Sequence, residues 1–256
     1  MKSLEVLFTP ADFLNLAQRD LSETTCVVFD VLRATSTMVT ALWNGAEALI
    51  PVEEISEALA LRKRQGGVLL AGERDGVRIG SELTGSVTFD LGNSPREFTT
   101  AAVQGKTIVM TTTNGTRALR ASAKARATLA GSFLNLGAIA TAIRKSEPAQ
   151  LLLVCSGTLD QAAYEDVLGA GALCDLLWDR YAQGDIADSA SMSRELFRQA
   201  SQDLESAISR SRNARRLLSK PDLRADVAFC LQRDLFPLVA ALGKDGLIRR
   251  GSESRL

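Results

Sequence analysis

The sequence contains no histidine among its 256 residues. This absence excludes Ser-His-Asp and Cys-His catalytic groups, histidine-ligated zinc, phosphohistidine intermediates and every imidazole general base. Any catalysis must therefore use carboxylates, hydroxyls, thiols, Lys or Arg, backbone N–H groups, or a metal held by oxygen ligands.

Other scarce features restrict the class of protein. The four cysteines lie far apart without a C-x-x-C pair, which is typical of reduced thiols. Lys and Arg balance Asp and Glu at 30 each, so the overall charge gives no reason to expect a nucleic acid or an anionic membrane as partner. No apolar run approaches the roughly 20 residues that span a bilayer, and the first residues lack the apolar stretch of a signal peptide. We expect a soluble, cytoplasmic protein.

Short apolar, β-branched runs alternate with longer helical patterns along the chain. The pattern predicts an α/β protein, a three-layer α/β/α fold with a largely parallel or mixed sheet covered on both faces. The predicted strands are 4–8, 25–29, 48–52, 68–71, 107–110, 127–130 and 151–155, and the predicted helices are 37–44, 55–65, 116–124, 136–146, 164–181 and 193–209. Residues 236–242 and 246–249 are predicted to form a closing hairpin.

A faint internal repeat aligns residues 26–35 with residues 107–116. The same register aligns 46–49 with 127–130. We expect one domain over 1–256, with a possible duplication giving two similar subdomains at about 1–105 and 106–256.

Polar segments follow several of the predicted strands. In an open α/β sheet, ligands bind beyond the carboxyl ends of the strands, so we expect these segments to converge. They are 30–37, 72–76, 89–97, 110–117 and 156–166.

The first segment leads from a strand into a helix. Asp30, at the last strand position, can hold a divalent metal or act as a base, and Arg33 offers a fork of donors to an oxyanion. Thr35, Ser36 and Thr37 can cap the helix, whose N-terminus attracts phosphate, and Arg33, Thr35 and Ser36 are candidate substrate ligands. An ordinary N-cap with a surface ion pair would explain the same residues.

The remaining segments supply further candidate ligands for an anion and for Mg²⁺. A charged turn and capped helices would explain most of them without a ligand. The candidate anion ligands are Arg74, Asn93, Ser94, Thr113, Asn114, Gly115, Thr116, Arg117, Ser156 and Gly157. The candidate metal ligands are Asp30, Glu73, Asp90, Glu165 and Asp166.

Two familiar phosphate-handling arrangements are excluded. No G-x-x-x-x-G-K-[ST] occurs, so the chain has no nucleotide P-loop. A thiolate phosphatase needs an Arg six positions after its cysteine, whereas Gln161 stands there after Cys155, so we interpret Cys155 as a buried thiol.

Taken together, the polar segments resemble the 2-phosphosulfolactate phosphatase (ComB) family. The shared motifs are D-V-L-R-A-T-[ST]-T at 30–37, G-E-R at 72–74, F-D-x-G-N-S-P at 89–95, T-T-N-G-T at 112–116, C-[AS]-G at 155–157 and E-D at 165–166. Asp226 to Cys230 and Asp234 are similar to the family's C-terminal pattern.

The resemblance implies Mg²⁺-dependent hydrolysis of (2R)-2-phospho-3-sulfolactate to 3-sulfolactate and phosphate, a step towards coenzyme M. As a mechanistic hypothesis, catalytic Asp30, Glu73 and Asp166 hold Mg²⁺ or position a water. Charge on the phosphoryl oxygens is then stabilised by Asn114 and by the guanidinium groups of Arg33, Arg74 and Arg117.

Residues 77–88 depart from the resemblance because they form a longer loop than the family leads us to expect. Since this loop joins two candidate site segments, it can reshape the pocket and change the substrate. The alternatives are a Mg²⁺-dependent phosphatase of another phosphorylated hydroxy acid, or a non-catalytic protein that binds a phosphorylated metabolite. A homodimer is the default expectation for oligomeric state.

Overall fold

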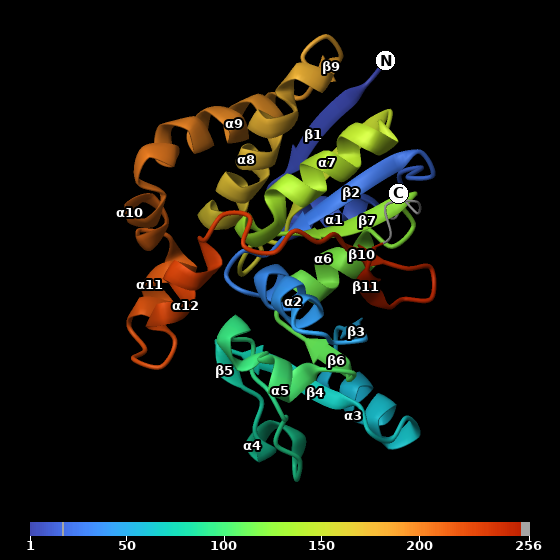
Figure 1. Cartoon of the computed structure of the whole chain (residues 1–256), viewed down its shortest axis with the longest axis vertical. Helices are drawn as coiled ribbons and strands as arrows, with labels where there is room; N and C mark the ends of the chain where they lie inside the picture. The colour runs from blue at the N-terminus through green and yellow to red at the C-terminus, as the bar shows by residue number, and fades with distance from the viewer. Residues whose placement is uncertain (17, 252–256) are drawn as a thin grey trace.

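The computed structural model describes residues 1–16 and 18–251. One mixed sheet runs through the molecule in the order β5-β4-β6-β3-β11-β10-β7-β2-β8-β1-β9, with helices packed on both of its faces (Figure 1). This arrangement confirms the predicted three-layer α/β/α fold.

The strands are β1 (Ser3–Leu7), β2 (Thr24–Phe29), β3 (Ala48–Val52), β4 (Leu69–Arg74), β5 (Val77–Arg78), β6 (Thr107–Thr111), β7 (Ala127–Gly131), β8 (Gln150–Cys155), β9 (Asp185–Ile186), β10 (Ala240–Leu242) and β11 (Ile248–Arg250). The α-helices are α1 (Pro10–Leu16), α2 (Ala34–Trp43), α3 (Ile55–Arg64), α4 (Ser81–Thr84), α5 (Thr100–Val103), α6 (Gly115–Ala121), α7 (Leu136–Ser146), α8 (Tyr164–Tyr181), α9 (Asp188–Ala200), α10 (Leu204–Ser209), α11 (Arg212–Leu218) and α12 (Arg224–Cys230). Single 3₁₀ turns occupy Pro95–Glu97, Phe133–Asn135 and Ser201–Asp203.

The strands of the two halves of the chain interleave. Strand β2 pairs in parallel with β7 and β8, and β6 pairs in parallel with β3 and β4. The predicted hairpin is confirmed as antiparallel β10 and β11, which join β7 to β3. The two halves therefore share one sheet, and the internal duplication stays a prediction.

Alternation along β2 fills both faces of the sheet. Val27 and Phe29 pack in the cluster beneath α7, α8 and α9, whereas Cys26 and Val28 pack in the cluster beneath α1, α2 and α6. Because both faces are covered, every residue of β2 is buried, which explains the apolar run from Cys26 to Phe29.

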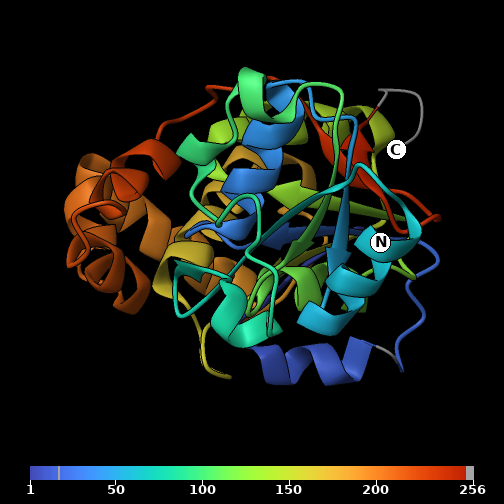
Figure 2. The same ribbon diagram turned by 90° about the horizontal axis from the view of Figure 1, so that it is seen from below.

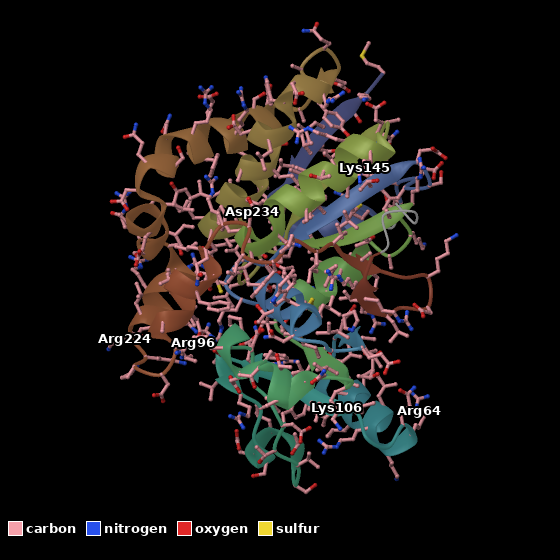
Figure 3. All side chains as sticks on the ribbon, viewed as in Figure 1. Arg64, Arg96, Lys106, Lys145, Arg224 and Asp234 are labelled. Atoms are coloured by element: carbon pink, nitrogen blue, oxygen red, sulfur yellow. The ribbon has the colours of Figure 1, made fainter. Side chains whose placement is uncertain are left out.

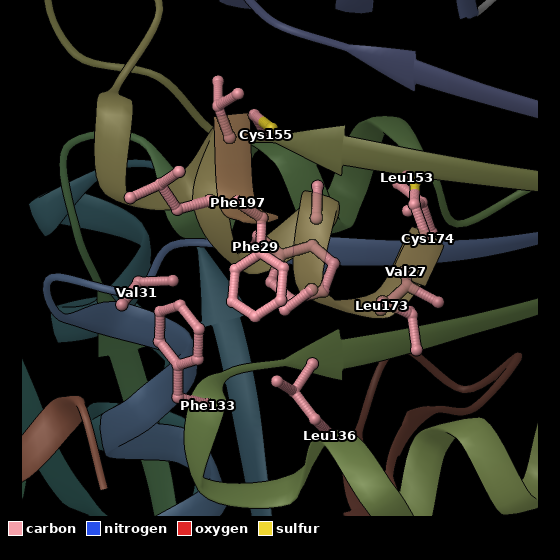
Figure 4. Packing of buried hydrophobic residues seen from close by; sticks show 14 of the residues in the cluster. Val27, Phe29, Val31, Phe133, Leu136, Leu153, Cys155, Leu173, Cys174 and Phe197 are labelled. Carbon is pink, nitrogen blue, oxygen red and sulfur yellow. The ribbon is translucent and has the colours of Figure 1, made fainter. Parts of the chain in front are cut away.

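Cys155 lies within the first of these clusters (Figure 4). Burial, with a smaller contribution from the charge of Asp166, raises the pKa of its thiol well above the ordinary value. This confirms Cys155 as a buried thiol, and all four cysteines are free and buried.

Several predicted helices have different bounds, among them α6, which ends at Ala121 and not at the predicted residue 124. Helix α2 begins at Ala34, three residues before the predicted start, because the Asp30 side chain accepts the Ala34 N–H and caps the first turn. The predicted helix 193–209 is wrong as one element, since Asp203 accepts the Ser206 N–H at 3.0 Å and starts α10 as a separate helix.

The C-terminal helices lie at one side of the molecule. Helices α10 to α12 gather beyond the sheet in two perpendicular views (Figures 1 and 2). Within the described residues, no helix has both the length and the apolarity to cross a membrane.

Candidate active site

The carboxyl ends of β2, β4, β6 and β8 meet at a cavity of about 80 Å³, called here the strand-end cavity. Parallel strands end at the same edge of a sheet, which brings together segments far apart in the sequence. The predicted site residues on its wall are Asp30, Arg33, Glu73, Asn93, Thr113, Asn114 and Gly157. The predicted convergence of the strand ends is confirmed.

Asp30 is a half-buried carboxylate on the cavity wall, directly after β2. Its Oδ1 accepts the Ala34 N–H at 3.0 Å, while its Oδ2 lies against Gly115, where a Cβ would come within 2.6 Å. The pKa of Asp30 is raised to about 6, mainly by burial and to a smaller extent by the charges of Glu73 and Glu165, while the hydrogen bond from the Ala34 N–H opposes the rise. Asp30 can therefore exchange a proton near neutral pH.

Glu73 joins the turn after β4 to the turn after β6. Its Oε2 accepts the Gly76 N–H at 2.7 Å, and its Oε1 accepts both the N–H of Thr113 at 3.1 Å and the Thr113 hydroxyl at 2.9 Å. Both carboxylate oxygens of Glu73 are thus engaged in holding the cavity wall.

Asp166 performs the same task between β2 and β8. Its Oδ1 accepts the Val31 N–H at 2.8 Å, and its Oδ2 accepts from the Ser156 hydroxyl at 3.1 Å and the Gly157 N–H at 3.2 Å. Burial first, then the charges of Asp30 and Glu165, raise the pKa of Asp166 well above its usual range.

Glu165 has one oxygen without a partner. Asn213 Nδ2 donates to its Oε1 at 2.6 Å, whereas its Oε2 is buried and meets no hydrogen-bond donor among the described residues. Among the residues that the structure describes, no three His, Cys, Asp or Glu side chains lie close enough together to hold a metal ion.

A buried ion network holds Arg33. Its Nη1 lies 2.7 Å from Asp226 Oδ2, and its Nη2 donates to the Gly76 carbonyl at 2.9 Å. Asp226 is fully buried and also accepts from the Ser94 hydroxyl at 2.7 Å and from Arg96 Nε at 2.9 Å. The peptide bond between Leu32 and Arg33 is cis. Asp226 therefore orients the guanidinium that reaches the strand-end cavity.

Several predicted substrate ligands shape the site without lining the strand-end cavity. The hydroxyls of Thr35 and Ser36 donate to the carbonyls of Asp30 and Val31, so these residues lie inside α2 and do not cap it. Thr116 bonds back to Thr112, and Gly115 allows close contact with Asp30. Two more predicted ligands, Ser94 and Ser156, donate their hydroxyls to Asp226 and Asp166. Thr37, predicted as a helix cap, donates instead to the Asn93 carbonyl.

The structure does not bring Arg74, Arg117 or Asp90 to the strand-end cavity. Successive residues of a strand point to opposite faces, so Arg74 points away from Glu73 and donates to the Glu53 carbonyl and to Thr111. Arg117 is exposed on α6. Asp90 pairs with Arg62 at 2.6 Å and accepts the Leu70 N–H, so it is not placed as a metal ligand of this cavity.

Sequence reasoning missed the contribution of α11. Asn213 and Arg216, three positions apart and so on one helix face, both line the strand-end cavity, as do Asp75 and Thr158. The Arg-rich stretch around α11 was the available signal, but solvent exposure explains such a stretch equally well. Its packing over the cavity depends on contacts distant in sequence, such as the 2.7 Å bond from Asn213 to Thr158.

Comparison with known proteins identifies the family of the chain. The family described as 2-phosphosulpholactate phosphatase matches residues 13–245. A protein from Thermotoga petrophila, named probable 2-phosphosulfolactate phosphatase, is 42% identical over 85% of this chain and 88% of its own length. Proteins of the same name from Pseudothermotoga lettingae and Clostridium acetobutylicum are 39% and 33% identical, over 93% and 88% of this chain and 98% and 92% of their own lengths. The chain therefore belongs to the 2-phosphosulpholactate phosphatase family, a family of phosphatase enzymes.

Proposed function

We propose that this protein is a Mg²⁺-dependent phosphatase that hydrolyses 2-phospho-3-sulfolactate to 3-sulfolactate and phosphate. Family membership and the names of the relatives support the substrate. The observation that carries the chemistry is Asp30, a carboxylate with a pKa of about 6 on the wall of the strand-end cavity.

Asp30 is the proposed proton-transfer group. A pKa near the working pH lets a carboxyl group both give and accept a proton, and such catalysis typically contributes about 10²–10⁴ in rate. Glu73 and Asp166 use their oxygens to hold the backbone turns around Asp30, so we assign them to positioning. This assignment refines the hypothesis that all three acids act directly.

The acids of the site suit Mg²⁺ by their chemistry. Mg²⁺ commonly takes one or two protein carboxylates and fills its remaining positions with waters and phosphate oxygens. Glu165 would hold it, because its Oε2 is buried without a donor and its charge is felt at Asp30, while Asp30 stays outside the ligand set as the proton-transfer group. When bound, the ion would neutralise charge on the phosphoryl oxygens.

The cationic and neutral donors of the cavity suit a phosphoryl group. Arg33 and Arg216 line it from opposite parts of the chain, and Asn114 adds an amide. A guanidinium held by Asp226 is positioned before the substrate arrives, so little reorganisation is needed as negative charge develops on the phosphoryl oxygens.

The test is phosphate release from 2-phosphosulfolactate and from 2-phospholactate, each with Mg²⁺ and with EDTA. We expect metal-dependent release that favours the sulfonate. Equal rates on both substrates would support phosphatase activity but contradict the proposed specificity for the sulfonate. No release from either would remove the enzymatic proposal and favour a protein that only binds a phosphorylated metabolite.

Three broader expectations belong with this proposal. Free, buried thiols support action in the reducing cytoplasm. The product 3-sulfolactate suits a route to coenzyme M, and a homodimer stays the expected assembly.

A further inference from the structure

A second depression adjoins the strand-end cavity and has the opposite charge. This depression, called here the basic groove, has a volume of about 680 Å³ and shares Arg33, Gly76 and Asn93 with the strand-end cavity. It lies between the β4–β5 turn, the turn around Ser94, and the segment that joins α11 to α12.

The charges on the two walls differ in sign. The strand-end cavity carries the carboxylates of Asp30, Glu73 and Asp75 against two guanidiniums. In contrast, the cationic side chains of the basic groove outnumber its acidic ones; they are Arg33, Arg78, Arg96 and Lys220, against Glu97 and Asp222. A molecule that spans both would place a metal-assisted phosphate on one side and a second anion on the other.

The size of the strand-end cavity requires such a span. Pockets that enclose a whole small molecule usually measure about 300–1,000 Å³, so a cavity of about 80 Å³ suits one polar group of a larger ligand. The remainder of a substrate held there must extend through a shared wall.

The cationic side chains of the basic groove are held by hydrogen bonds to the protein and can still donate further hydrogen bonds to a ligand. Arg96 gives its Nε to buried Asp226 and its Nη2 to the Asp222 carbonyl at 2.8 Å, which leaves Nη1 directed at no other described group. Lys220 Nζ donates to the Asp75 carbonyl at 2.9 Å and has two further protons to donate. Arg78 is already neutralised by Glu97 at 3.4 Å, so it contributes less.

An unpartnered amide lies at the junction of the two depressions. Asn93 is 5% exposed, and its Oδ1 meets no donor among the residues that the structure describes. A half-turn of the amide exchanges its oxygen for its N–H donors, so the same side chain can meet an anion that crosses the junction. Leaving a buried amide unpaired is costly, which points to a ligand at this position.

We propose that the basic groove binds the sulfonate of the substrate, with Lys220, Arg96 and Asn93 as its donors. This inference rests on the proposed function and deepens it, because it assigns the residues that distinguish a sulfonated phosphoester from a smaller one. Val77 and Arg78, from the extended loop at 77–88, form part of the same wall. The loop therefore contributes to the choice of substrate.

A competing depression lies on the other side of Asn213. It measures about 240 Å³ and shares Thr158 and Asn213 with the strand-end cavity, with Arg212 and Arg215 on its wall. Because none of the cations that line it also lines the strand-end cavity, we assign the second anion to the basic groove. Arg215→Ala therefore serves as the rival variant.

The test compares Lys220→Ala, Lys220→Arg and Arg215→Ala with an exposed control, Arg64→Ala, at the end of α3. Arg64 is a suitable control because it is exposed and lies away from the basic groove, whose donor Arg96 is seen near the C-terminal helices in Figure 3. For Lys220→Ala we expect about a tenfold higher KM for 2-phosphosulfolactate, a kcat within about twofold, and a lost preference over 2-phospholactate. Lys220→Arg should restore most of the preference.

Calorimetric titration with 3-sulfolactate gives a readout that does not need turnover. If 3-sulfolactate binds more weakly to Lys220→Ala than to Arg64→Ala, the assignment of the basic groove is supported even without phosphate release. An absence of phosphate release would then contradict only the proposed function. Equal binding to these two variants, an equal loss on both phosphoesters, or a selective loss in Arg215→Ala would overturn the assignment of the groove.

Discussion

Asp30 is expected to lower the stability of the folded protein at neutral pH, and Asp30→Asn should reverse this. The pKa of Asp30 rises from 3.8 to about 6 on folding, mainly through burial. The folded protein therefore holds this proton more tightly than the unfolded chain, and its free energy of unfolding falls as pH rises from about 4 to 6. A pKa rise of this size corresponds to about 3 kcal/mol, which is lost in full above about pH 7.

Asparagine retains the shape of the side chain and an acceptor for the Ala34 N–H but does not titrate. We expect Asp30→Asn to match the wild type near pH 4 and to exceed its free energy of unfolding by about 3 kcal/mol at pH 8. In the wild type, the charge of Asp30 also raises the pKa of Asp166. Removing that charge therefore stabilises the folded protein further.

Urea denaturation between pH 4 and pH 8, with EDTA present, measures this difference. EDTA is needed because a bound cation would itself lower the pKa of Asp30. Glu82→Gln, at an exposed acid in α4, should show no such trend. A difference between Asp30→Asn and wild type that stays constant across the pH range would refute the reasoning.

Three further substitutions test the supporting contacts. Asp226→Asn leaves the buried Arg33 without its carboxylate, so the free energy of unfolding should fall by about 3–5 kcal/mol in urea denaturation; a loss below 1 kcal/mol would contradict the buried pair. Gly115→Ala would place a Cβ 2.6 Å from Asp30 Oδ2, so phosphate release should drop by about 10²-fold with an unchanged circular dichroism spectrum, and full activity would show that this contact relaxes freely. Arg216→Ala should lower kcat/KM about tenfold while Arg117→Ala stays within twofold, as measured by initial rates; the reverse order would restore Arg117 to the site.

The strands and their convergence were predictable because their cause is local. Strand β2 is buried on both faces, and its residues 26–29 form an unbroken apolar run, as do residues 151–155 of β8. Once parallel strands are recognised, their carboxyl ends must share an edge, which placed Asp30 and Glu73 together without any knowledge of distances.

The sequence predictions that were wrong for individual site residues depend on which side chain forms a hydrogen bond with which backbone group. Asp30 caps α2, so Thr35 and Ser36 lie within the helix, although their sequence is equally typical of a cap. Alternation along β4 sends Arg74 away from Glu73, a consequence that strand periodicity alone could have predicted.

The part of the site contributed by α11 had no local signal. Asn213 reaches the cavity through bonds to Thr158 and Glu165, residues about fifty positions earlier in the chain. Likewise, Arg33 and Asp226 are 193 positions apart, and no local sequence pattern predicts that they pair.

The most direct test of the central claim compares phosphate release from 2-phosphosulfolactate by the wild type and by Asp30→Asn, with saturating Mg²⁺ at pH 7. The account predicts metal-dependent release by the wild type and a rate at least about 10² lower in the variant, which remains folded. Equal rates in the two proteins would remove Asp30 from the chemistry and contradict the account.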